Sequence, residues 1–176
     1  MWPIDHVFPN GLPNFVVEDN IFSSEFTEKM ILYPTEVCML SNTQFICLQT
    51  FLRMIGESRY IITDSSILDN PISERLNLDV FETELDYSLI KMLYFNPVTV
   101  FCSVNATWGA VISDEEYAII GCKRQHASCF ASAFRCCKEQ RQVFASEYAK
   151  REDLPNKYYN EKLVNKILSW VPEITY

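Results

Sequence analysis

One stretch of the chain, residues 97–122, constrains the fold more than any other; it reads PVTVFCSVNATWGAVISDEEYAIIGC. Val, Ile, Thr, Phe, Tyr and Trp dominate it, and these residues suit a pleated, half-buried surface. We therefore expect three strands, at residues 98–104, 107–112 and 117–122, joined by two tight turns. Apolar residues occur on both faces of these strands, which is typical of the middle of a sheet covered on both sides.

The alternation of side chains along these strands predicts which residues share a face. In the first strand the even-numbered residues from 98 to 104 point to one side, and Phe101 points to the other. In the second strand Trp108 shares a face with residues 110 and 112. A tryptophan on a central strand is normally a core residue, and Gly109 beside it indicates a bulge or the close approach of a helix.

Helical periodicity is clearest just before a short predicted strand. Ser41, followed three residues later by Gln44, is a capping-box pattern that marks the start of a helix. Apolar residues then recur at helical spacing up to residue 55, and Gly56 stands where a helix would end. Residues 59–64, RYIITD, follow as a strand, and residues 65–78 are expected to be a loop.

Four other helices are expected from the remaining pattern. The first covers residues 23–33, and the second covers residues 79–95, which begin with an acidic segment. The third covers residues 126–148 and the last follows residue 156. Five side chains form one apolar stripe on the third helix: Phe130, Phe134, Cys137, Phe144 and Tyr148.

These elements predict an α+β fold with a central, mostly antiparallel sheet flanked by helices. The regular strand–helix alternation of a doubly wound fold is absent. We expect a single domain over residues 1–176, because the length and the 48% of hydrophobic residues suffice for one core. Within it we expect an irregular N-terminal arm at residues 1–22, the strand meander at residues 97–122 and C-terminal helices at residues 125–176.

The sequence indicates a protein of the cytoplasm that does not enter a membrane. The first residues lack the basic and apolar regions of a secretory signal, and no run approaches the roughly 18 apolar residues of a membrane span. The seven cysteines are odd in number and lie in apolar stretches. We therefore expect reduced thiols that pack as small hydrophobic residues in the core.

Charge is distributed unevenly along the chain. Residues 1–122 carry 17 acidic and 5 basic residues, a net charge of −12, whereas residues 123–176 carry 10 basic and 6 acidic residues, a net charge of +4. The total is −8. An acidic body repels the phosphates of nucleic acids and attracts basic proteins, so we expect a basic protein as the partner and no nucleic acid.

Few residues are available for chemistry. With four glycines and two histidines, the chain has neither a phosphate-binding loop nor a dinucleotide-binding fingerprint. The best metal-binding pattern is Cys122, His126 and Cys129, with Cys136 as a fourth soft ligand, but it lacks the paired cysteines of a zinc knuckle. A Cys129 thiol activated by His126 is the enzymatic version of the same idea. The commoner interpretation is that these thiols lie in the core, so no cofactor is expected.

Two acidic segments are the most distinctive surface features of the sequence. Plain solvation accounts for many such segments. As a functional hypothesis, the two segments form a docking face for a basic protein, with Phe81, Tyr87 and Tyr117 beside them as anchors. The acids proposed to bind the partner are Asp79, Glu82, Glu84, Asp86, Asp114, Glu115 and Glu116.

The end of the meander resembles a known group of proteins. Residues 107–122, TWGAVISDEEYAIIGC, combine a Trp-Gly strand, an acidic turn and a strand that ends Ile-Ile-Gly, and a helix follows. This pattern is similar to that of small bacterial immunity proteins, which protect cells against polymorphic toxins, including those of contact-dependent growth inhibition. The resemblance implies a non-enzymatic inhibitor that binds a cognate toxin domain, often a basic nuclease, and blocks its active site or substrate groove.

Two functional hypotheses of different classes follow. The first is an immunity protein, not an enzyme, that neutralises a basic toxin domain through an acidic face. The second is a small Cys/His-dependent enzyme or metal-binding regulator that uses Cys122, His126 and Cys129. A third idea, a mimic of DNA, has less support because such mimics need denser and more regular acidic arrays.

Overall fold

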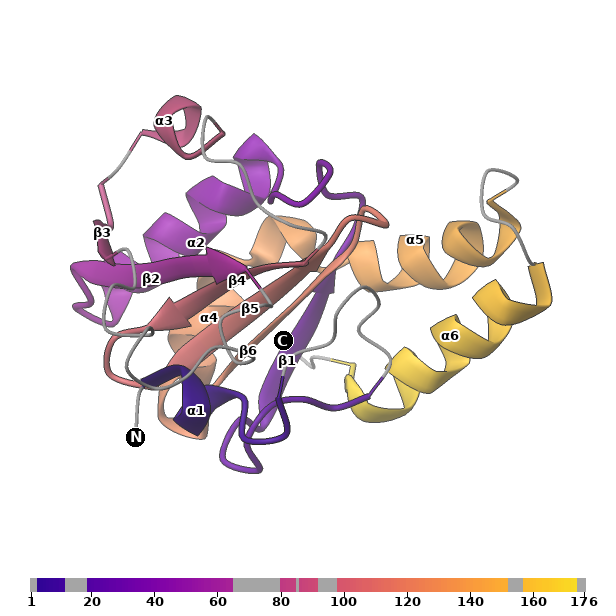
Figure 1. Ribbon diagram of the computed structural model, residues 1–176, viewed down its shortest axis with the longest axis horizontal. Helices are drawn as coiled ribbons and strands as arrows, with labels where there is room; N and C mark the ends of the chain where they lie inside the picture. Colours follow the sequence, from indigo (N-terminus) through magenta and orange to yellow (C-terminus); the bar gives the residue numbers. More distant parts are fainter. Residues whose placement is uncertain are drawn as a thin grey trace.

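Six strands form one antiparallel sheet in the order β1-β6-β5-β4-β2-β3 (Figure 1). The computed structural model describes residues 3–11, 19–64, 80–84, 86–91, 98–151 and 157–173. The strands are β1 (Glu28–Leu32), β2 (Arg59–Asp64), β3 (Val80–Glu82), β4 (Val98–Ser103), β5 (Trp108–Ser113) and β6 (Ala118–Cys122). With its helices, the sheet makes a single compact α+β domain, as the sequence predicts.

Helices cover both faces of this sheet. They are α1 (Pro3–Val7), α2 (Asn42–Met54), α3 (Tyr87–Lys91), α4 (Ala127–Ala133), α5 (Gln140–Glu147) and α6 (Lys157–Trp170), with short 3-10 turns η3 (Arg124–His126), η4 (Arg135–Cys137) and η5 (Tyr148–Lys150). The core on one face contains side chains of α2 and α4, and the core on the other contains side chains of α1, α5 and α6 (Figure 1). Of the helices in the described ranges, none has the length and apolar character needed to cross a bilayer.

The central meander, β4 to β6, agrees with the prediction. Every residue of these three strands is buried. Val98 and Val100 lie in the core with α1 and α6, whereas Phe101 and Trp108 lie in the core with α2 and α4. The predicted alternation between two covered faces is therefore confirmed.

The start of the chain contains a helix where an irregular arm was expected. This helix, α1, lies on the central strands, and Gly109 allows its close approach. A Cβ atom at Gly109 would lie 2.5 Å from Val7 Cγ1 and 2.8 Å from Phe8 Cζ. The close approach predicted from Gly109 is thus confirmed, and no side chain has room there.

Helix α2 begins and ends where its sequence signals predict. Ser41 Oγ accepts a hydrogen bond from the backbone N–H of Gln44, and Gln44 Oε1 accepts one from the backbone N–H of Ser41. Gly56 follows the helix with a φ of 72°, a conformation that favours glycine. The next strand, β2, has the bounds expected for RYIITD.

The helix predicted at residues 23–33 is wrong in this structure. Residues 28–32 form β1, not part of a helix, and pair with β6. Their apolar side chains alternate between the two cores: Met30 and Leu32 lie in one and Ile31 in the other. This period of two suits a strand, and pairing with a buried neighbour overrides the weak helical pattern.

The acidic segment also differs from its predicted helix. Residues 80–82 form the edge strand β3, which places Phe81 opposite Tyr60 of β2. Among the described residues of this segment, the five residues of α3 are helical. The remaining predictions for this part of the chain, the loop at residues 65–78 and the helical residues 92–95, lie outside the described residues.

The long helix expected at residues 126–148 is broken into α4, η4 and α5. The break sends the two halves of the predicted apolar stripe to different faces of the sheet. Phe130, Phe134 and Cys137 pack in the core with α2, whereas Phe144 and Tyr148 pack in the core with α6. The chain thus passes around the β1 edge of the sheet at η4 (Figure 1).

Candidate functional site

The register of the sheet separates the two predicted acidic segments. In the strand register, Glu82 of β3 lies opposite Arg59 of β2. The next residue of β2, Tyr60, lies opposite Ser103 at the end of β4. The other segment follows Ser113, which pairs with the first residue of β4. The two segments therefore lie at opposite ends of the central strands, and Asp79 lies outside the described residues.

The segment between β5 and β6 makes contacts within the chain. The Tyr148 hydroxyl donates a hydrogen bond to Glu115 Oε2, and Arg151 Nη1 lies 2.9 Å from Glu116 Oε2. Burial and the carboxylate of Glu115 raise the pKa of Tyr148 well above its usual value. Asp114 accepts a hydrogen bond from the Ser113 hydroxyl at 3.4 Å. These contacts hold the turn against η5 and leave its acids only half exposed.

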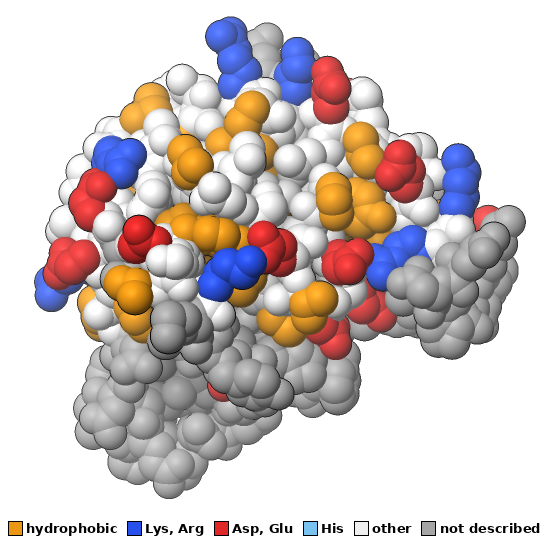
Figure 2. Space-filling view, turned by 90° about the horizontal axis from the view of Figure 1, so that it is seen from above, with side chains coloured by type: hydrophobic (Ala, Val, Ile, Leu, Met, Phe, Trp, Pro, Cys, Tyr) orange, Lys and Arg blue, Asp and Glu red, His pale blue; other side chains and the backbone are white. Residues whose placement is uncertain are grey.

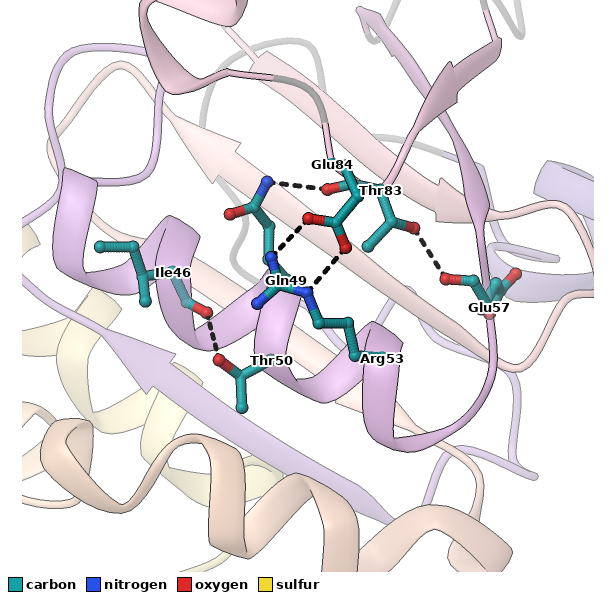
Figure 3. Close-up of polar contacts among 7 residues, drawn as sticks. All are labelled: Ile46, Gln49, Thr50, Arg53, Glu57, Thr83 and Glu84. Atoms are coloured by element: carbon teal, nitrogen blue, oxygen red, sulfur yellow. Dashed lines mark hydrogen bonds and ion pairs between the residues drawn. The ribbon is translucent and has the colours of Figure 1, made fainter.

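The other segment lies along α2 (Figure 3). Arg53 donates through Nε and Nη2 to the two carboxylate oxygens of Glu84, each at 2.7 Å. Gln49 Nε2 donates to the backbone oxygen of Thr83, also at 2.7 Å. Asp86 accepts hydrogen bonds from the backbone N–H and the hydroxyl of Ser88, which lowers the pKa of Asp86. The segment is thus held against the exposed side of α2 by side chains of that helix.

A further acid, Glu36, belongs to the same surface. Lys91 Nζ of α3 lies 2.5 Å from Glu36 Oε2, and the Tyr87 hydroxyl lies 3.0 Å from Glu36 Oε1. These partners lower the pKa of Glu36, while burial acts in the opposite direction. The Tyr87 hydroxyl oxygen also lies 2.7 Å from the backbone oxygen of Leu40. α3 is therefore fixed to the turn that precedes α2.

Exposed apolar side chains gather on this surface as well. Among the described residues, the large hydrophobic side chains with the greatest exposure, 47% or more, are Val37, Ile46, Met54, Val80 and Leu89. Two of them, Ile46 and Met54, lie on α2, Leu89 lies on α3, and Val37 follows Glu36. The fifth, Val80, lies opposite Ile61 of the α1 and α6 core and so points away from α2. We call the surface formed by the exposed side of α2 and by residues 36–37, 83–84 and 86–91 the α2–α3 face.

The α2–α3 face is hollowed and mixed in character. A shallow hollow lies between α2 and residues 84, 86 and 87, and Phe45, Ile46 and Asp86 are among the residues that line it. Figure 2 shows hydrophobic side chains there, interspersed with acidic and basic ones. Of the predicted aromatic anchors, Tyr117 is fully buried and the other two pack partly against the core. The exposed apolar contacts of this face are therefore aliphatic.

Basic residues of the C-terminal part neutralise acids elsewhere on the body. Lys123 Nζ lies 2.7 Å from Glu25 Oε2, and Lys166 Nζ lies 3.1 Å from Asp19 Oδ1. Arg151 pairs with Glu116 in the same way. The cations of the tail thus bind acids outside the α2–α3 face in each of these pairs.

The cysteines that come together are not those predicted from spacing. Cys47 Sγ of α2 lies 3.1 Å from Cys136 Sγ and 3.9 Å from Cys137 Sγ, and the latter two atoms are 3.8 Å apart. We call these three residues the thiol cluster. Within the described ranges, it is the one group of three or more Cys, His, Asp or Glu residues whose ligand atoms all lie within 4.8 Å of one another.

Contacts within the thiol cluster shift the pKa values of its members in opposite directions. Hydrogen bonds from Cys137 and Cys136 lower the pKa of Cys47, although burial acts in the opposite direction. The same contacts, together with burial, raise the pKa of Cys137. These contacts favour the thiolate form of Cys47, which is the form that binds a soft cation.

The predicted ligand set is not assembled. Burial raises the pKa of Cys122 to about 12, so this thiol is neutral. The His126 ring packs edge-on against Phe51, and its Nε2 atom lies 3.1 Å from Gln125 Nε2. Of the four predicted ligands, only Cys136 belongs to the observed cluster. Its contact with Cys47 joins residues that are 89 positions apart in the sequence. No local spacing signals such a contact.

Glu57 is a buried acid that no sequence pattern pointed to. Its carboxylate accepts hydrogen bonds from Ser103 Oγ at 2.5 Å, Thr107 Oγ1 at 3.1 Å and Trp108 Nε1 at 2.9 Å. Its backbone oxygen accepts one from Thr83 Oγ1 at 2.7 Å (Figure 3). With its oxygens satisfied in this way, Glu57 joins the turn after α2 to the β4–β5 hairpin.

Comparison with known proteins finds no matching family model, no matching curated protein and no matching solved structure. Two features of the chain itself carry chemical meaning. The α2–α3 face offers exposed aliphatic groups among acids, which suits contact with another protein. The thiol cluster offers three sulfur atoms within reach of one small ion.

Proposed function

We propose that this protein is a non-enzymatic inhibitor of the immunity type, which binds and neutralises a cognate basic toxin domain through the α2–α3 face. The observation that carries this proposal is the gathering of exposed aliphatic side chains among acids on that face. Protein interfaces combine such an apolar centre with a polar rim. Solvation alone accounts for the acids but not for the apolar groups between them.

Charge supports a basic partner. Both cations of the face, Arg53 and Lys91, are already paired with acids of the same face. Asp86 forms no ion pair with a described residue, and it remains available to cations of a partner. The acidic body adds a long-range attraction, which speeds the encounter with a basic domain and weakens as salt is added.

The resemblance of residues 107–122 to immunity proteins supports the same class of function. These residues form β5 and β6 in the buried middle of the sheet. The resemblance therefore concerns the scaffold, whereas the proposed contacts lie on α2 and α3. A nuclease is one kind of basic toxin domain that such a face would suit.

The test begins with the tagged chain as bait in a lysate of its native host, at low and then moderate salt. A stoichiometric basic polypeptide is identified by mass spectrometry, purified as a domain, and assayed for toxicity and enzymatic activity. We expect one equivalent of the chain to abolish that activity. A bound polypeptide whose activity the chain leaves unchanged would contradict the proposal.

Variants then locate the interface. The change Asp86→Lys is expected to slow association about threefold at low salt and to reduce its salt dependence. Leu89→Asp is expected to raise the Kd at least about tenfold, mainly through faster dissociation. Glu161→Lys on the exposed side of α6 is the matched control. Equal inhibition by all of these variants would remove the α2–α3 face from the proposal.

A further inference from the structure

The thiol cluster joins parts of the chain that the fold brings together from a distance. Cys47 lies on the buried side of α2, one turn after Gln44. Cys136 and Cys137 lie in η4, where the chain leaves α4 and turns towards α5. Gln140 fixes this junction, because its Oε1 atom accepts hydrogen bonds from Gln44 Nε2 and from the backbone N–H of Tyr33, both at 2.9 Å.

We propose that Cys47, Cys136 and Cys137 form a binding site for a thiophilic metal ion, with Zn²⁺ as the ion that fits best. This site is independent of the α2–α3 face and of the partner proposed for it. Three thiolates from one chain suit a soft or borderline ion and disfavour magnesium or calcium, which prefer oxygen ligands.

The sulfur positions agree with zinc geometry. With Zn–S bonds of about 2.3 Å in a tetrahedron, two sulfur ligands lie about 3.8 Å apart. Cys137 Sγ already lies 3.9 Å from Cys47 Sγ and 3.8 Å from Cys136 Sγ. Only the Cys47–Cys136 separation, 3.1 Å, has to widen. Cys136 is the exposed member, so its side chain can make this movement without disturbing the core.

The three cysteines differ in burial, and so in what each contributes to the site. Cys47 and Cys137 are buried in the core with α2 and α4, which fixes two sulfur atoms in place. The exposed Cys136 gives an ion a path from solvent to the cluster. Three protein ligands leave a fourth tetrahedral position, which would hold water or a small ligand from solution. The site therefore resembles an open zinc centre more than a closed structural one.

A disulfide is the competing fate of such a cluster. The Cys47 and Cys136 sulfur atoms would have to approach from 3.1 Å to about 2.05 Å. That bond would not involve Cys137, although the Cys137 sulfur lies 3.9 Å and 3.8 Å from the other two, as two sulfur ligands of one zinc ion would. Binding of an ion uses all three sulfur atoms and therefore also accounts for the position of Cys137.

The test uses the full chain, purified under reducing conditions, treated with a chelator and then titrated with Zn²⁺ and with Cd²⁺. We expect one equivalent of Zn²⁺, measured by competition with a chromophoric chelator, and a thiolate-to-cadmium absorption band of three-sulfur intensity. Cys47→Ser, Cys136→Ser and Cys137→Ser should each weaken Zn²⁺ binding by at least about 100-fold, because each removes a direct ligand. Each should also lower the cadmium band by about one third.

Cys129→Ser is the matched control, since Cys129 belongs to the ligand set predicted from spacing. It should bind Zn²⁺ like the unchanged chain, and a loss equal to that of Cys136→Ser would overturn the assignment. Binding of less than about 0.2 equivalents by the fully reduced chain would also overturn it. If the variants of the buried cysteines do not fold by circular dichroism, the exposed Cys136→Ser decides the question alone.

Discussion

Replacement of Glu57 by alanine tests whether a buried carboxylate holds the central hairpin to the turn after α2. The change removes the acceptor of three hydrogen bonds. The Ser103 and Thr107 hydroxyls lie 3.0 Å apart and can then bond to each other. The Trp108 indole N–H is fully buried and loses its acceptor. A hydrogen bond to a charged group contributes about 1.5–3 kcal/mol. We therefore expect an interaction free energy of about 1.5–3 kcal/mol between Glu57 and Trp108.

A double-mutant cycle isolates that coupling from the other effects of each change. Trp108→Phe removes the N–H donor and part of the ring, but the loss of the ring occurs in both backgrounds and cancels. The free energy of unfolding is measured by urea denaturation, followed by far-UV circular dichroism because one fluorophore is removed. A cycle of Trp108→Phe with the exposed Glu84→Ala should show no coupling. A coupling below about 0.5 kcal/mol between Glu57 and Trp108 would refute the reasoning.

Two further changes probe the packing of the sheet. Gly109→Ala is expected to lower the free energy of unfolding by about 1–3 kcal/mol, because Val7 and Phe8 must move. Urea denaturation measures this loss. If the contact with Val7 is responsible, the second change Val7→Ala should restore part of the stability. Tyr60→Phe should leave stability unchanged or raised at pH 7, since the buried hydroxyl finds no hydrogen-bond partner among the described residues. Burial raises the pKa of Tyr60 and of Tyr148, so stability should fall as the pH rises above about 10, where tyrosines ionise in the unfolded chain first. A pH series of unfolding curves checks this, and Tyr60→Phe should show a shallower fall.

The parts of the fold that sequence patterns predict are those with strong local signals. The meander has β-branched residues on both faces, and α2 has a capping box at its start and glycine after its end. Residues 28–32 carry no such local signal. Their strand exists because β6 presents a partner, and that partner is distant in the sequence.

The break between α4 and α5 shows why periodicity alone was insufficient. The apolar spacing from Phe130 to Tyr148 continues through the break, so the pattern is that of one helix. The structure instead uses the two halves of the stripe on opposite faces of the sheet. Which face each half covers depends on the space left by α2 and α6, and the spacing of residues 130–148 contains no information about that space.

The candidate sites likewise include residues that the local sequence indicates and residues that only the fold brings together. The exposed acids at residues 84 and 86 were visible in the sequence, whereas their apolar neighbours on α2 and α3 required the fold. The thiol cluster depended on the fold entirely, because η4 places Cys136 and Cys137 beside α2. Spacing along the local sequence led instead to Cys122, His126 and Cys129.

The order of strands has a consequence for how the chain acquires its structure. Glu28 pairs with Cys122, 94 residues further along the chain, whereas β4, β5 and β6 are joined by short turns. Local hairpins form quickly, and pairings across long loops form slowly. During synthesis at about 5–20 residues per second, β1 would wait about 5–20 s for β6 with its backbone N–H and C=O groups unpaired. The meander is therefore the natural nucleus, and the interval before β1 joins it is when the newly made chain is most exposed to aggregation.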